Sequence, residues 1–229
     1  MDAKAILDSL LSSGKQLSDK AVSFAEANLG LPKAGQERDA MLGNLGKGAV
    51  VGGLAAMLFG TKSGRNLSGK LVAVGSVAAV GTIAYTAYQN WMKSQGKVAD
   101  VQNDAPIATL AGAAADRRSL LILRAMIAAA KADGVVDSDE QKMMDDQLNR
   151  MDLADDAKKW LRMEMAANYD AKSIAAQVDS PAAAAEVYLM SSMVVDDASP
   201  VERAYLDQLR DSMNMDQGLV DQIRNQMHG

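Results

Sequence analysis

The sequence predicts an all-α protein, because its composition favours helices and it lacks the pattern of strands. Ala, Leu, Met, Gln and charged residues dominate its 229 residues, and these have high helix propensities. Only 4% of the residues are aromatic, and no run of strand length alternates cleanly in β-branched and aromatic residues. We expect an amphipathic helical segment over residues 1–40, a Gly-rich apolar helical hairpin over 41–98, a linker over 99–115 and a helical bundle with an internal pseudo-repeat over 116–229.

The residue inventory excludes several kinds of catalytic site. The chain has no cysteine, which excludes thiol nucleophiles, disulfides and cysteine-bound zinc. Its single histidine is His228, next to the last residue, where chain ends are usually poorly ordered. The sequence holds no phosphate-binding loop ending in Lys-Ser and no nucleophile with a base partner. We therefore expect that the protein is not an enzyme.

Charge is distributed unevenly along the chain. Residues 1–100 hold 11 Lys and Arg against 7 Asp and Glu, a net charge of +4, whereas residues 101–229 hold 13 against 22, a net charge of −9. This asymmetry indicates different partners for the two halves. Because phosphates would be repelled by the acidic half, we expect no nucleic-acid binding there.

The N-terminal segment has apolar residues at helical spacing. They are Ile6, Leu7, Leu10, Leu11 and Leu17. Asp2 and Asp8 interrupt any apolar core of a signal peptide. The pattern is typical of one or two amphipathic helices, which lie on a membrane surface or dock onto another part of the protein.

The second region predicts a membrane anchor. Residues 71–88 carry no charge, and a helix of that length is about 27 Å long, close to the ~30 Å of a hydrocarbon core. Tyr85, Tyr88 and Trp91 follow with Lys93, as an interfacial aromatic belt would. We therefore expect a transmembrane helix in this region.

A second apolar run, over residues 48–61, carries small residues at every fourth position. The ladder consists of Gly48, Gly52, Ala56, Gly60 and Gly64. Small residues at this spacing let another helix approach closely. This predicts a protein partner or self-association through the ladder. The alternative is a Gly/Ala-rich hairpin that is buried in an oligomer without a membrane.

The C-terminal region repeats itself with an offset of 62 residues. The offset relates Glu140 to Glu202 and Leu161 to Ile223, and further pairs are Met143 with Tyr205, Met144 with Leu206, Met151 with Met213 and Leu153 with Met215. Each copy has an apolar helix, an acidic loop and an amphipathic helix. This predicts two helical hairpins about a pseudo-twofold axis.

The two acidic loops, "DGVVDSDE" and "DDASPVE", have two explanations. Asp137 with Glu140, and Ser199 with Glu202, fit the spacing of a helix capping box. Capping does not explain three further acids, which follow apolar helices where the helix dipole disfavours negative charge; these are Asp133, Asp196 and Asp197. Oxygen ligands of this kind suit Ca²⁺ or Mg²⁺. The sequence leaves open whether the loops bind a divalent cation or only cap helices.

The two loops also carry a family resemblance. "AKADGVVDSDE" and "VVDDASPVERAYLDQL" resemble the tellurite-resistance TerB-like domain, and the order of segments resembles the uncharacterised YebE-like inner-membrane family. The resemblance implies an all-helical bundle with no known reaction and a loose link to envelope or chemical stress. It further implies a location in the bacterial inner membrane, and we expect the C-terminal domain on the cytoplasmic side. It also implies a divalent-cation site formed by Asp133, Asp137, Glu140, Asp196, Asp197 and Glu202. The Ser199-Pro200 pair departs from the Asp-Gly pattern of the first loop.

Two functions follow from these patterns. The first is a membrane-anchored, non-catalytic binding module whose acidic domain binds a divalent cation or a basic protein partner. The second is a structural membrane protein that assembles through its glycine ladder and has no metal site.

Overall fold

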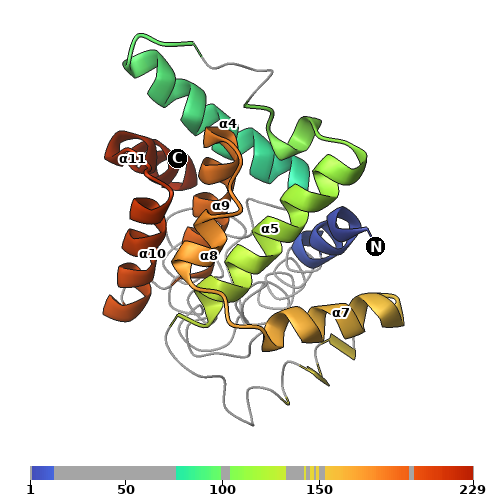
Figure 1. Ribbon diagram of the computed structural model, residues 1–229. Helices are drawn as coiled ribbons and strands as arrows, with labels where there is room; N and C mark the ends of the chain where they lie inside the picture. Colours follow the sequence, from blue (N-terminus) through green and yellow to red (C-terminus); the bar gives the residue numbers. More distant parts are fainter. Residues whose placement is uncertain are drawn as a thin grey trace, which may run out of the picture.

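The computed structural model confirms the predicted all-α class: every element in the residues that it describes is helical (Figure 1). It describes residues 2–12, 76–98, 104–132, 153–195 and 199–228, with the single positions 142, 145, 146, 148 and 149. The elements are a helix over residues 3–12, α4 (Val77–Ser94), the 3-10 turn η3 (Ile107–Thr109), α5 (Gly112–Ala130), α7 (Asp155–Ala166), α8 (Ala171–Ala175), α9 (Pro181–Val194), α10 (Pro200–Ser212) and α11 (Gln217–His228).

Helix α9 is the central element of this arrangement. It begins sharply, because the Ser180 side chain accepts a hydrogen bond from the Ala183 N–H and Pro181 occupies the first helical position. Every residue from Ala182 to Val194 is buried, as expected for a helix that is apolar all round. Helices α4, α5, α10 and α11 pack against it.

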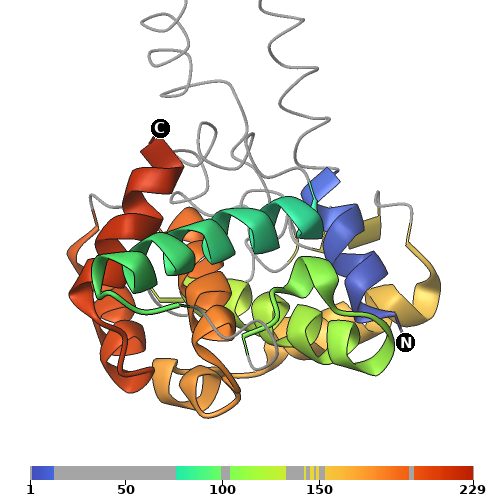
Figure 2. The ribbon, with the colours of Figure 1, turned by 90° about the horizontal axis from the view of Figure 1, so that it is seen from above.

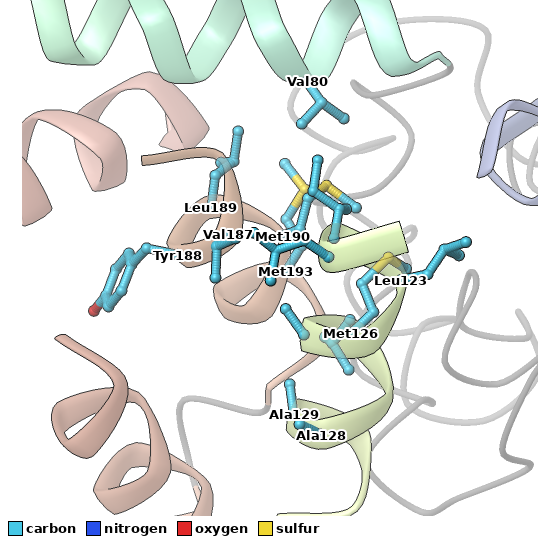
Figure 3. Close-up of a cluster of buried hydrophobic side chains, with 14 of the residues drawn as sticks. Val80, Leu123, Met126, Ala128, Ala129, Val187, Tyr188, Leu189, Met190 and Met193 are labelled. Atoms are coloured by element: carbon cyan, nitrogen blue, oxygen red, sulfur yellow. The ribbon is translucent and has the colours of Figure 1, made fainter. Parts of the chain in front are cut away.

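Helices α5 and α9 run in the same general direction. Arg118, in the first half of α5, contacts Ser180 and Glu186 at the beginning of α9. Farther along both helices, Met126 of α5 lies in one apolar cluster with Met193 of α9 (Figure 3). The chain therefore leaves the C-terminal ends of both helices on the same side of the bundle.

The predicted transmembrane helix over residues 71–88 is wrong. Ser76 has an extended backbone and caps α4, so the helix begins at Val77 and continues past the apolar run to Lys93 and Ser94. Within the described part of the chain, no helix combines the length and the apolar character that crossing a bilayer requires. This finding overturns the predicted location in the bacterial inner membrane with a cytoplasmic C-terminal domain.

The residues of the predicted aromatic belt instead make contacts within the protein. Tyr88 is buried, and its hydroxyl donates a hydrogen bond to Asp104 over 2.7 Å. The Trp91 indole N–H donates to Asp216 over 3.1 Å, which links α4 to the residue before α11. The apolar run was misread because hydropathy reports how apolar side chains are and not whether lipid or protein covers them.

The helix over residues 3–12 docks onto the rest of the protein, as one of the two sequence interpretations expected. It lies beside the beginnings of α4 and α5 in both views (Figures 1 and 2). Its apolar stripe is buried: Ala3, Ile6, Leu7, Leu10 and Leu11. Leu17 lies outside the described residues.

The bounds of two helices agree with the offset of 62 residues. Helix α7 covers 155–166 and α11 covers 217–228, so both ends differ by 62. Ala157 and Leu161 are buried in α7, and so are their counterparts Leu219 and Ile223 in α11. The pseudo-twofold relation between the two hairpins remains a prediction.

Candidate functional site

Most of the predicted cation ligands lie outside the described residues. These are Asp133, Asp137, Glu140, Asp196 and Asp197. The same holds for the predicted interaction ladder of Gly48, Gly52, Ala56, Gly60 and Gly64. The structure therefore brings neither set together nor separates it.

The sixth predicted ligand, Glu202, is described and lies in the first turn of α10. Glu202 is buried, with 2% of its surface exposed. The Ser199 side chain accepts a hydrogen bond from the Glu202 N–H over 3.4 Å, and Pro200 holds the first helical position. The start of α10 thus has the cap that the Ser-Pro-x-Glu pattern predicted. Across the described ranges, no three acids or histidines gather in a way that could hold a metal ion.

The directions of α5 and α9 determine where the two acidic loops begin. Ala132 and Val195 are the last described residues before Asp133 and Asp196. Because α5 and α9 point the same way, the chain enters both loops from one end of the helix pair. Lys131 marks this end: its ammonium donates to the carbonyls of Met165 and Ala167 at 3.1 and 2.9 Å. Burial lowers the pKa of Lys131.

A buried charge network joins α5, α9 and η3 near the beginnings of α5 and α9, away from Lys131. One Glu186 oxygen accepts from the Arg118 guanidinium over 2.8 Å, and the other accepts from the Ile107 N–H over 2.6 Å. Arg118 also donates to Asp179 over 2.8 Å and to Ser180 over 3.3 Å. Glu186 is fully buried, and this burial raises its pKa although Arg118 and the Ile107 N–H favour the charged form.

A second network links α5 to α7 and to the chain that follows α7. The Arg124 guanidinium holds both oxygens of Glu164, at 2.9 and 3.1 Å. The Tyr169 hydroxyl donates to the same carboxylate, and the Arg124 guanidinium lies 5.5 Å from the centre of the Tyr169 ring. Burial opposes ionisation of Glu164, but these hydrogen bonds together outweigh it and lower its pKa.

Sequence reasoning missed both networks. One signal was available for the first: Glu186 is the only charged residue in "PAAAAEVYLMSSMVV", and a lone charge in a buried helix needs a partner. The second pairs residues 40 positions apart, Arg124 and Glu164, and no local pattern marks such a pair. Both networks fix helices to each other.

Comparison with known proteins identifies a family. No curated protein matches the chain, and no solved structure matches it. The family model described as "Protein of unknown function (DUF533)" matches residues 44–227, which is most of the sequence. The chain belongs to this family.

Proposed function

We propose that the protein is a non-catalytic helical binding module whose two acidic loops together hold a divalent cation, Ca²⁺ or Mg²⁺. The ligands would come from Asp133, Asp137, Glu140, Asp196, Asp197 and Glu202. Carboxylate oxygens are the ligands that both ions prefer. A basic surface of a protein partner is the other occupant that this charge would attract.

One observation carries the proposal: α5 and α9 run in the same general direction, because Arg118 meets Ser180 and Glu186 near the beginnings of the two helices and Met126 lies near Met193 farther along both. Each acidic loop follows one of these helices. If the helices ran in opposite directions, the loops would begin at opposite ends of the pair, and a shared ion would be excluded. Two loops that begin at one end would concentrate negative charge there, and a cation would offset the repulsion.

The same proposal includes a TerB-like character for residues 116–229. The support is the resemblance of the two loop sequences and the matching bounds of α7 and α11 at the offset of 62 residues. In such a duplicated domain the two loops would occupy equivalent places. Ser199 is the main departure, because its hydroxyl is used to cap α10.

The test is isothermal titration calorimetry of the full chain with Ca²⁺ and with Mg²⁺, together with thermal unfolding. We expect saturable heat and a higher Tm, because an ion that binds only the folded state stabilises it. Both effects should disappear in the double variant Asp133→Asn/Asp196→Asn. The matched control, Asp155→Asn/Asp221→Asn, removes two exposed acids of α7 and α11 and should keep the heat.

Two results would contradict the proposal. The first is the absence of heat at millimolar concentrations of both ions. The second is equal loss of binding in the two double variants, which would mean that the ions respond to net charge and not to a built site.

A further inference from the structure

We propose that the beginnings of α4 and α5 form a docking site for a short amphipathic helix, and that residues 3–12 of this chain occupy it as an exchangeable ligand. The proposal concerns a different part of the molecule from the acidic loops and does not depend on them.

The first argument is reciprocal capping across the contact. Val77 is the first residue of α4, and its N–H donates to the Asp8 side chain over 2.9 Å. In return, the Lys4 N–H donates to the Asp116 side chain of α5 over 3.3 Å. Both N–H groups lie in the first turn of a helix, where they have no partner within it. Each side of the contact therefore supplies a carboxylate that accepts a hydrogen bond from a free N–H group of the other side, and this makes the recognition specific.

The second argument is the complete burial of one helix face. Leu7 and Leu10 have no exposed surface, and Leu11 has 1%. Charged side chains border this buried face: Lys4 and Asp8 form an ion pair over 3.5 Å with side chains about two-fifths exposed, while Asp8 also accepts from the Val77 N–H. A docked apolar face with partly exposed charges at its edge is the arrangement in which grooves bind amphipathic peptides.

The third argument is that the helical structure of this segment depends on packing. An amphipathic helix in a protein gains most of its stability from burial of its apolar face and not from helix propensity, and here that face is buried. Residues 3–12 must therefore gain their helical structure from the contact itself. Ordering the segment opposes the gain from apolar burial, so we expect docking and release without unfolding of α9.

The experiment uses the wild-type full chain and a synthetic peptide of residues 1–12. Hydrogen exchange followed by mass spectrometry should show amides of residues 6–12 exchanging at least 100-fold faster than those of α9. Excess peptide should accelerate exchange of residues 6–12 further, because it holds the chain's own segment out of the site. A fluorescent form of the peptide should bind saturably.

Peptide variants separate specific docking from nonspecific adsorption. Asp8→Ala should weaken binding about fivefold through loss of the cap on α4, and Leu7→Asp should abolish it. A full-chain variant with Leu7→Asp and Leu10→Asp should bind the wild-type peptide more tightly than the wild-type chain does, since its own segment no longer competes.

Either of two results overturns the proposal. Equal protection of residues 6–12 and α9 in the wild-type chain would make the N-terminal helix an integral part of the core. A peptide that shows no saturable binding, or that binds equally well with Leu7→Asp, would mean that no such site exists.

Discussion

At the scale of single residues, the buried glutamates Glu186 and Glu164 have pKa values shifted in opposite directions. Glu186 is fully buried and its pKa is raised, because desolvation exceeds the help from Arg118 and the Ile107 N–H. The Glu164 carboxylate is desolvated less, and its pKa is lowered, because Arg124 holds both of its oxygens and Tyr169 donates a third hydrogen bond. The two glutamates therefore differ both in the depth of burial and in how many donors reach the carboxylate.

Removal of the Glu186 carboxylate should be strongly destabilising. Glu186→Ala leaves Arg118 buried without its main partner and the Ile107 N–H without an acceptor, and breaking a buried ion pair costs about 3–5 kcal/mol. Glu186→Gln should cost less, because the amide oxygen can still accept from Ile107. Urea unfolding monitored by circular dichroism measures both changes.

The control for this prediction is the other acid on Arg118. The Asp179 side chain is 71% exposed, and exposed ion pairs contribute about 0–1 kcal/mol. Asp179→Ala should therefore change the free energy of unfolding by about 1 kcal/mol or less. Equal costs for Glu186→Ala and Asp179→Ala would refute the buried network as a main source of stability.

At the scale of elements, the contact between α4 and η3 depends on one glycine. A Cβ at Gly81 would lie 2.8 Å from the Ala108 nitrogen and 2.9 Å from the Ala108 Cβ. Neither atom belongs to the end of a flexible side chain, so the turn itself would have to move. Gly81 thus sets how closely η3 approaches α4, and with it the position of Ile107, whose N–H reaches Glu186.

Gly81→Ala should destabilise the protein in spite of the better helix propensity of alanine. The propensity gain is about 1 kcal/mol, whereas overpacking costs typically 1–3 kcal/mol, and displacement of Ile107 would weaken the Glu186 network as well. Thr82→Ala, at the exposed neighbouring position, is the control and should have little effect. A Tm for Gly81→Ala equal to or above that of the wild type would show that η3 can move away from α4 at little energetic cost.

The elements also show what the sequence could predict. The all-α class and the start of α10 were predictable, because composition and the Ser-Pro-x-Glu pattern act locally. The start of α4 was not, since Ser76 caps the helix in the middle of an apolar stretch. Whether lipid or protein covers an apolar face depends on distant segments such as α9 and α11, and no local pattern reports them. For the candidate site, only the cap by Ser199 is observed as predicted.

At the scale of the whole molecule, acid should weaken the contact of α5 with α7. The folded pKa of Glu164 is lower than its ordinary value, so its contribution to stability is fully present above the unfolded pKa of about 4.3. That contribution is lost as the pH falls through the lower, folded pKa. Stability should therefore decline below about pH 4.3 in part through this one group.

The variant Glu164→Gln tests this dependence. It should be less stable than the wild type at pH 7, and the difference should shrink as the pH falls below about 4.3, because the wild-type carboxylate then becomes neutral. Urea unfolding at a series of pH values between 3 and 7 gives the comparison. A difference that stays constant over this range would mean that the charge of Glu164 is not what holds Arg124.

The common direction of α5 and α9 has a kinetic consequence. Antiparallel neighbours can be joined by a short turn, but two helices that point the same way need a return path, and here Arg118 meets a residue 68 positions later in the chain. Contacts of such long range slow folding, because the intervening chain must close before they form. We expect this bundle to fold more slowly than an up-and-down bundle of equal length, with the pairing of α5 and α9 among its late steps.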